Sequence, residues 1–230
     1  MERFVEDRVA VFIDGSNLYH ALRANFSRYD LKFTEFIKKL CGSRRLFRAY
    51  YYNVLQDPGQ RPDAHREQQD FLSALRETPY LDVRLGGTKL AQGVPVEKGI
   101  DVMIVTDLLN FAWDDLYDVA VLVSGDSDFA YALQAVKNLG KYIEVAYFES
   151  NVSRDILEVA DNKHLLDRNF FKDLWSHKRT PRRKGKRPST LINRGGSTQV
   201  VDAFSHSTIK PRLNGRVGEV VTEPTDPEGV

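Results

Sequence analysis

The sequence predicts an α/β fold in which a mostly parallel sheet is covered by helices on both faces. Two observations indicate this class. Short β-rich apolar runs, such as Arg8–Ile13 and Val119–Val123, alternate with segments of helical periodicity, of which Ile100–Trp113 is the clearest. The apolar runs lack polar alternation, which is typical of strands that are buried on both faces. Strands that alternate with helices are joined by crossovers, so their sheet is largely parallel.

The composition divides the chain into a predicted domain and a predicted tail. The 230 residues are 42% hydrophobic, which is enough for one domain with a sizeable core. Residues 1–176 hold 22 Lys or Arg against 27 Asp or Glu, whereas residues 177–230 hold 11 against 5. We therefore expect a folded domain at 1–176 and a basic, largely disordered tail at 177–230. The tail begins with a strongly basic run, in which seven of the ten residues 178–187 are Lys or Arg.

Several classes of protein are disfavoured by the sequence. No apolar run approaches the roughly 20 residues of a membrane helix, and the N-terminus lacks the apolar region of a secretory signal. Cys41 is the only cysteine, which excludes an internal disulfide and a multi-cysteine zinc site. We expect a cytoplasmic protein without membrane contact, and the sequence leaves its oligomeric state open.

In the first half of the chain, local signals predict three strands and three helices. The strands are expected at Arg8–Ile13, Leu46–Leu55 and Leu81–Leu85, and the helices at Leu18–Phe26, Thr34–Cys41 and Ala64–Glu77. Ser16 or Asn17 is the expected N-cap of the first helix and Thr34 that of the second. Gly86–Gly99 contains several Gly and Pro residues, which predicts an irregular loop or a hairpin.

In the second half, the amphipathic pattern of Ile100–Trp113 predicts a long helix. Its apolar residues recur at three- to four-residue spacing. The further expected elements are strands at Val119–Val123, Tyr142–Phe148 and Leu165–Leu166, helices at Phe129–Leu139 and Asp155–Ala160, and a last helical turn at Asn169–Trp175. Ser153 is the expected N-cap of the helix at Asp155–Ala160.

Four aspartates fall at the ends of these predicted elements. Asp14 ends the first strand, Asp101 begins the long helix, and Asp126 and Asp128 follow the strand Val119–Val123. If the strand order is 3-2-1-4-5, the first and fourth strands are neighbours, and the crevice between their ends is where ligands bind in such sheets. All four carboxylates are then expected at one edge of the sheet.

Such a cluster needs a cation. Two carboxylates 4 Å apart repel each other by about 4 kcal/mol at an effective dielectric constant near 20. Ligands that are all oxygen atoms favour a hard ion, Mg²⁺ or Mn²⁺. Such an ion can activate water and stabilise a leaving oxygen, which is the chemistry of phosphodiester hydrolysis. We therefore predict that Asp14, Asp101, Asp126 and Asp128 are metal ligands and catalytic residues.

Each aspartate also has a purely structural interpretation. Asp126 or Ser127 can cap the following helix, and Asp101 and Asp128 can be first-turn acids that the helix dipole favours. The coincidence of acids at three separate element ends favours the metal site over these alternatives. Asp107, six residues after Asp101, falls on a different face of its helix and is excluded from the site.

Four polar residues are accessory candidates. Asn17 can hold a water or a phosphate, and we include it among the catalytic residues; its alternative is a helix N-terminus. Ser124 can hydrogen-bond a metal-bound water, or be a turn hydroxyl. Lys98 can bind a phosphate, or be a solvated loop lysine. Arg154, near the strand at Tyr142–Phe148, is a further candidate for binding substrate.

Three segments together carry a resemblance to a known family. They are FIDGSNLYHAL (12–22), EKGIDVMIVTDLL (97–109) and VLVSGDSDFAYAL (121–133), and they resemble the NYN domain, the LabA-like branch of the PIN-like nuclease superfamily. Over residues 8–168 the resemblance implies a Rossmann-like three-layer αβα sandwich and a Mg²⁺-dependent single-strand RNase. It assigns the acidic positions to Asp14, Asp101, Asp126 and Asp128, with Asn17 as an accessory residue. Residues 162–164, Asn-Lys-His, depart from the family pattern, which is apolar there.

The predicted function is therefore a metal-dependent endoribonuclease that acts on single-stranded RNA. One alternative is a regulatory module that binds RNA or a nucleotide in the same cleft without turnover. A third hypothesis is a Mg²⁺ phosphatase, which is disfavoured because Ser16 occupies the position where such enzymes have a second Asp. The basic tail is a candidate for contacting RNA or a protein partner, and a solvated linker is the plainer alternative.

A single-strand nuclease also needs a basic or aromatic path to its acids. The candidates for a basic path are Arg23, Arg28, Arg44, Arg45, Arg48 and Arg154. Tyr50 and Tyr52 share one face of their strand and Tyr51 lies on the other, so one face could stack bases. Packing of these tyrosines in the core is the favoured interpretation.

Overall fold

The computed structural model describes residues 6–176 except 57, 60–61 and 92–93, and the side chains of 64 and 88–98 lie outside the description. The predicted tail at 177–230 therefore lies outside the described residues. The strands are β1 (Arg8–Asp14), β2 (Arg45–Val54), β3 (Leu81–Ala91), β4 (Val94–Lys98), β5 (Val119–Val123), β6 (Tyr142–Tyr147) and β7 (Asn162–Leu165). The helices are α1 (Gly15–Phe26), α2 (Phe33–Cys41), α3 (Pro62–Arg76), α4 (Ile100–Trp113), α5 (Ala130–Asn138) and α6 (Arg154–Val159), with a short 3₁₀ turn, η1 (Ser127–Phe129).

The strands form one mostly parallel sheet, as predicted. Within the described residues its order is β4-β3-β2-β1-β5-β6-β7, and only the pair β3–β4 is antiparallel. The predicted order 3-2-1-4-5 is confirmed, since its fourth and fifth strands are β5 and β6 and β1 lies between β2 and β5. The chain moves outward in opposite directions from β1 and β5, so the crevice at their carboxyl ends is the topological switch point of the sheet.

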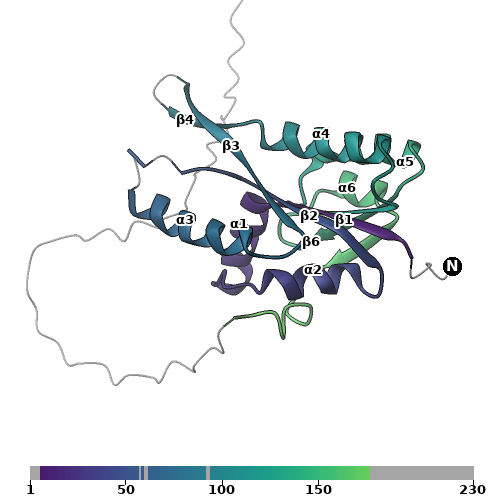
Figure 1. Cartoon of the computed structure of the whole chain (residues 1–230), viewed down its shortest axis with the longest axis horizontal. Helices are drawn as coiled ribbons and strands as arrows, with labels where there is room; N and C mark the ends of the chain where they lie inside the picture. Colours follow the sequence, from purple (N-terminus) through teal and green to yellow (C-terminus); the bar gives the residue numbers. More distant parts are fainter. Residues whose placement is uncertain (1–5, 57, 60–61, 92–93, 177–230) are drawn as a thin grey trace, which may run out of the picture. The chain divides into compact units, whose positions relative to one another are not determined.

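Helices cover both faces of the sheet (Figure 1). The side chains of β1 alternate between two cores: Val9, Val11 and Ile13 pack with α1, α2 and α3, whereas Ala10 and Phe12 pack with α4, α5 and α6. All five are fully buried. This burial on both faces explains why β1 lacks polar alternation, and it confirms the predicted three-layer arrangement.

The strongest sequence patterns correspond closely to the observed elements. The helix predicted at Ile100–Trp113 and the strand predicted at Val119–Val123 have the predicted bounds. Ser153 caps α6, because its hydroxyl accepts a hydrogen bond from the backbone N–H of Asp155 at 3.2 Å. None of the described helices has the length and apolar character needed to cross a membrane.

The predicted caps of the first two helices are wrong. Helix α1 begins at Gly15, and Asp14 caps it by accepting a hydrogen bond from the backbone N–H of Asn17. Helix α2 begins at Phe33 without a side-chain cap, so Thr34 is already helical. Phe33 is buried in the core and packs edge-on against Tyr51, so packing determines where α2 starts.

Of three further segments, the first matches one of its two predicted alternatives, and the other two differ from the prediction. Gly86–Gly99 contains a hairpin, because β3 continues past its last partner in β2 and pairs with β4 instead. Asn169–Trp175 forms turns rather than a helical turn, and it is held by an antiparallel bridge between Leu31 and Trp175. The last strand spans Asn162–Leu165 rather than Leu165–Leu166, and it pairs with β6 despite its polar sequence.

Candidate active site at the ends of β1 and β5

Asp14 lies at the centre of the candidate site. It is the last residue of β1 and the N-cap of α1, and it is only 7% exposed. Its Oδ1 accepts a hydrogen bond from the backbone N–H of Asn17 at 3.0 Å, and its Oδ2 accepts one from the Ser124 hydroxyl at 3.2 Å. Both carboxylate oxygens are therefore fixed in orientation by neighbouring elements.

The surroundings of Asp14 disfavour its negative charge. The pKa of this carboxyl is raised from its ordinary value of 3.8 to about 6, chiefly by burial. The nearby carboxylates of Asp101 and Asp126 contribute to this rise, whereas the hydrogen bonds from Asn17 and Ser124 oppose it. Two of the predicted acids thus lie close enough to Asp14 to repel its charge. A cation among these three groups would remove that repulsion.

Asp101 reaches the site from the first turn of α4. The N-cap of this helix is Gly99, which makes no side-chain hydrogen bond and has a φ of 89°. This left-handed conformation favours glycine, and it turns the chain from β4 into α4. Asp101 is exposed, and it is also the first-turn acid that the helix dipole favours, so both interpretations of this residue fit the structure.

Asp126 and Asp128 follow β5 on the other side of the crevice. Asp126 caps η1, with its Oδ1 accepting the backbone N–H of Asp128 at 3.0 Å. Its own N–H donates to the Ser124 hydroxyl at 3.3 Å. Asp126 therefore combines the predicted capping role with a position beside Asp14. Asp128 is exposed, and its described hydrogen bond to this group is made by its backbone.

A second side-chain bridge connects α1 to the loop after β6. Asn151 donates a hydrogen bond from Nδ2 to Oδ1 of Asn17 at 3.1 Å. Asn151 is not among the site residues predicted from the sequence. Its position after a parallel strand, at the same edge as the ends of β1 and β5, is the signal that could have identified it.

Gly125 allows the loops after β5 and β6 to pack closely together. A Cβ atom at this position would lie 2.9 Å from the Cα of Val152, closer than such atoms approach. The carbonyl of Gly125 accepts a hydrogen bond from the backbone N–H of Ser153 at 2.9 Å. The loop that carries Asn151 and Arg154 is therefore fixed against the loop that carries Asp126.

Of the two cationic candidates, Arg154 and Lys98, only Arg154 has a side chain that the structure describes. Arg154 is 89% exposed at the start of α6 and pairs with Glu158 at 2.7 Å, one helical turn away. The backbone of Lys98 ends β4, but its side chain lies outside the described part of the chain.

Asp107 belongs to a separate buried network. It accepts a hydrogen bond from the Tyr52 hydroxyl at 2.7 Å and forms an ion pair with Arg84 at 2.6 Å. These contacts account for its carboxylate in structural terms, which agrees with its exclusion from the site.

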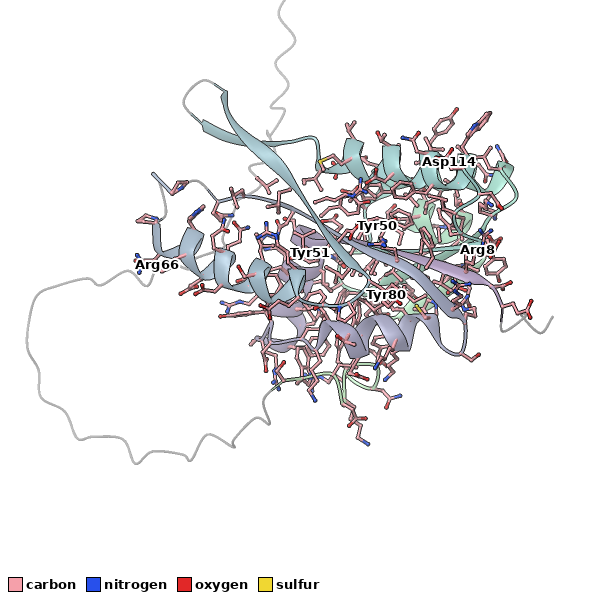
Figure 2. All side chains as sticks on the ribbon, in the orientation of Figure 1. Arg8, Tyr50, Tyr51, Arg66, Tyr80 and Asp114 are labelled. Atoms are coloured by element: carbon pink, nitrogen blue, oxygen red, sulfur yellow. The ribbon has the colours of Figure 1, made fainter. Side chains whose placement is uncertain are left out.

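Two predicted features of an RNA path are not free to bind substrate. Tyr50, Tyr51 and Tyr52 are all buried, which confirms that they pack in the core and leaves no face for stacking bases (Figure 2). Arg44 is also wrong as a path residue, because it forms a two-point ion pair with the buried carboxylate of Glu144.

The described side chains do not form a preorganised metal site. Within the residues that the structure describes, no group of three or more His, Cys, Asp or Glu side chains is arranged so that it could hold a metal ion. The available donors near Asp14 are carboxylate, amide and hydroxyl oxygens, which is the donor set that Mg²⁺ and Mn²⁺ prefer. The residues therefore fit a hard cation in chemistry, and the ion stays a prediction.

Comparison with known proteins relates the chain to one family. Residues 8–167 match the NYN domain. The chain is 28% identical over 167 residues to the low amplitude and bright protein LabA of Synechococcus elongatus, which covers 69% of this chain and 83% of LabA. A crystal structure of a protein of unknown function from Vibrio parahaemolyticus aligns with a TM-score of 0.60 and 22% identity, covering 73% of this chain and 97% of that one. At this identity the crystal structure supports the fold alone.

Proposed function

Because the chain belongs to the NYN domain family, which is part of the PIN-like nuclease superfamily, we propose that it is a metal-dependent endoribonuclease. The proposed reaction is hydrolysis of phosphodiester bonds in single-stranded RNA. The observation that carries the proposal is the position of Asp14, a buried carboxylate whose pKa is raised beside Asp101 and Asp126.

The proposed cofactor is Mg²⁺ or Mn²⁺. Asp14, Asp101 and Asp126 would hold the ion, and Asp128 would act from a more exposed position. When bound, such an ion supplies an activated water and stabilises the leaving oxygen of a phosphodiester. Its charge would also lower the pKa of Asp14, so that this carboxyl would be ionised below about pH 6 as well.

Other residues of the chain would position the acids and the substrate. Ser124 orients Asp14 by its hydrogen bond and also accepts the backbone N–H of Asp126. The bridge between Asn17 and Asn151 fixes two amide groups beside the acids. We assign binding of the RNA backbone to Ser124, Lys98 and Arg154; the Arg154 side chain is 89% exposed.

The proposal includes a setting and a second partner. We place the activity in the cytoplasm, where a single reduced cysteine such as Cys41, buried in the core, is ordinary. The basic run at 178–187 would add salt-dependent affinity for RNA or contact a protein partner.

The decisive experiment replaces one acid and measures cleavage. Purified protein and its Asp126→Asn variant are incubated with labelled single-stranded and double-stranded RNA in Mg²⁺, Mn²⁺ or EDTA. We expect the parent to cut single-stranded RNA only with a divalent ion, and the variant to lose at least about 100-fold in rate, since it removes a proposed ligand of the ion that would stabilise the developing negative charge.

Asp114→Asn is the matched control. Asp114 follows the last residue of α4, at the opposite end of the helix from Asp101, and it is exposed (Figure 2). This variant should cut RNA at the parental rate. Equal cleavage by parent and Asp126→Asn would refute the metal-site proposal, and RNA that is retained but never cut would support the alternative of a binding module.

A further inference from the structure

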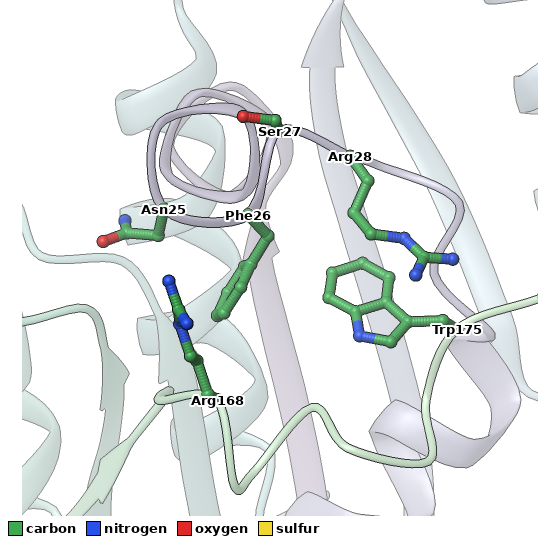
Figure 3. A pocket seen from close by; sticks show the side chains of 6 residues that line it. All are labelled: Asn25, Phe26, Ser27, Arg28, Arg168 and Trp175. Carbon is green, nitrogen blue, oxygen red and sulfur yellow. The ribbon is translucent and has the colours of Figure 1, made fainter. Parts of the chain in front are cut away.

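A pocket lies at the far end of α1 from the aspartates. It has a volume of about 380 Å³ and is lined by Asn25, Phe26, Ser27, Arg28, Arg168 and Trp175. Figure 3 shows Arg168 on one side of the Phe26 and Trp175 rings and Arg28 on the other. The volume is at the small end of the range for small-molecule sites, and its walls combine aromatic rings with guanidinium groups.

The two arginines of this pocket differ in how they are held. Arg28 forms a two-point ion pair with Asp30 at 2.7 and 2.6 Å and lies 4.4 Å from the Trp175 ring centroid. Arg168 is exposed, and no ion pair or hydrogen bond engages its side chain within the part of the chain that the structure describes. Arg28 is thus a fixed wall, whereas the charge of Arg168 is available to an anion.

The aromatic walls are also unequal. Trp175 contacts Arg28 and stacks against Phe171 with ring centroids 5.3 Å apart, so its faces are already in use. Phe26 is half-buried, and its ring contacts with Phe171 at 5.1 Å, Trp175 at 5.4 Å and Phe148 at 6.3 Å are all edge-to-face. A planar group in the pocket would therefore contact the Phe26 ring and the Arg168 guanidinium, the two kinds of surface on which proteins stack unpaired bases.

Side-chain hydrogen bonds connect α1 to the loop after β6 both near this pocket and at the acidic site. At the site, Asn151 bonds to Asn17 at 3.1 Å, and near the pocket Asn25 donates from Nδ2 to the Ser150 hydroxyl at 2.9 Å. Asn17 and Asn25 are about 12 Å apart along the helix axis at 1.5 Å per residue. At 3.4 Å per stacked nucleotide, that length corresponds to roughly three to four nucleotides.

The sequence that follows the pocket residue Trp175 is strongly basic. Lys178, the first residue of the basic run, comes three residues after Trp175 in the sequence. A run with seven Lys or Arg in ten residues, so close in sequence to a pocket residue, favours a polyanion over a small neutral molecule as the ligand. The same charge disfavours the basic run itself as the occupant.

We propose that this pocket is a second RNA subsite, in which Arg168 contacts a phosphate and Phe26 stacks a base of a strand that continues along α1 to the acidic site. The subsite rests on the proposed function for the identity of the acidic site. It extends that function by predicting a minimum substrate length, since a dinucleotide would not reach both places.

The test measures RNA binding by the full chain in EDTA, so that cleavage does not interfere. Fluorescence anisotropy gives the Kd for a labelled ten-nucleotide oligouridylate at several salt concentrations. We expect Arg168→Ala to weaken binding about tenfold and to reduce the salt slope by about one, as loss of one phosphate contact predicts. Arg168→Lys should keep the salt slope but recover only part of the affinity.

Arg66→Ala is the matched control for the loss of one positive charge. Arg66 is exposed on α3, outside the pocket lining, and its loss should change the Kd by less than about twofold. In Mg²⁺, Arg168→Ala should raise KM for the ten-nucleotide RNA and leave cleavage of a dinucleotide unchanged.

Several outcomes would overturn the subsite. These are an unchanged Kd in Arg168→Ala, an equal loss in Arg66→Ala, no RNA binding by the parent, or full competition by uridine monophosphate, which would identify a site for free nucleotides. The two proposals fail separately. Loss of affinity in Arg168→Ala without any cleavage by the parent would refute only the nuclease, and Asp126-dependent cleavage that is indifferent to Arg168 would refute only the subsite.

Discussion

The hydroxyl of Ser124 donates a hydrogen bond to Oδ2 of Asp14 at 3.2 Å and thereby joins the ends of β5 and β1. The two residues are 110 positions apart in the sequence, and both are buried. The same hydroxyl accepts the backbone N–H of Asp126 at 3.3 Å. One serine thus links two of the predicted metal ligands across the switch point of the sheet.

Ser124→Ala should therefore impair both stability and activity. The buried Asp14 carboxylate would lose a hydrogen-bond donor, at a cost of about 2 kcal/mol in the free energy of unfolding. Its pKa would rise further, because the Ser124 hydrogen bond acts to lower it. Urea denaturation at pH 7 and cleavage assays check these effects. Ser127→Ala, an exposed serine three residues later, is the control and should change stability by less than about 0.5 kcal/mol.

The raised pKa of Asp14 predicts an unusual dependence of stability on pH. The folded state keeps this proton up to about pH 6, whereas the unfolded state releases it near pH 3.8. The folded state binds more protons between these values, so the free energy of unfolding of the metal-free protein should fall as pH rises from about 4 to about 6. The gap between the two pKa values corresponds to a loss of up to about 3 kcal/mol.

Asp14→Asn isolates this contribution. The variant should lack the fall and should be more stable than the parent at pH 7 in EDTA, and Mg²⁺ should stabilise the parent but not the variant. Asp118 provides the opposite case, because its hydrogen bonds and ion pair with Arg8 lower its pKa. Asp118→Asn should reduce stability at neutral pH, with the difference vanishing in acid. A parent whose stability is flat from pH 4 to 6 would show that Asp14 is not perturbed.

The features that could be predicted from the sequence are those that local pattern determines. The apolar run at Val119–Val123 and the periodicity of Ile100–Trp113 each specify an element and its bounds. Once these were ordered as alternating strands and helices, parallel topology placed Asp14, Asp101 and Asp126 at one edge of the sheet. The proximity of these acids thus followed from general rules of topology.

The features that could not be predicted depend on contacts between distant parts of the chain. Asp14 displaced Ser16 and Asn17 as the cap of α1 because the helix begins directly where β1 ends. Asn151 joins the site only because Gly125 lets two loops pack closely. Glu144 stands in a buried strand, and its partner Arg44 is 100 residues away, so nothing near Glu144 in the sequence indicates what neutralises its charge.

Gly125→Ala should damage the site through the backbone. The added Cβ would lie 2.9 Å from the Cα of Val152, so the loops after β5 and β6 would have to separate. That movement would break the Ser153–Gly125 hydrogen bond and shift Asn151 from Asn17. We expect a loss of about 1–3 kcal/mol in stability, typical of overpacking, and a fall in cleavage rate. Gly87→Ala, where a Cβ has nothing within 4 Å, is the control; equal losses in both variants would contradict the close-packing argument.

The buried ion pair of Arg44 and Glu144 gives the last prediction. Glu144 is fully buried in β6, and its carboxylate accepts hydrogen bonds from Arg44 at 2.8 and 3.0 Å and lies 2.7 Å from His164. Arg44→Ala leaves a buried carboxylate without its main partner. It should lower the free energy of unfolding, measured by urea denaturation, by about 3–5 kcal/mol. The double variant Arg44→Leu, Glu144→Leu should recover most of that loss because it removes both charges.

Arg48→Ala is the control, since both side chains of its ion pair with Asp82 are about 40% exposed and the pair should contribute under about 1 kcal/mol to the free energy of unfolding. If the double variant were as unstable as Arg44→Ala, the loss would come from the packing of Arg44 and its hydrogen bonds to the carbonyls of α2, and not from an uncompensated charge.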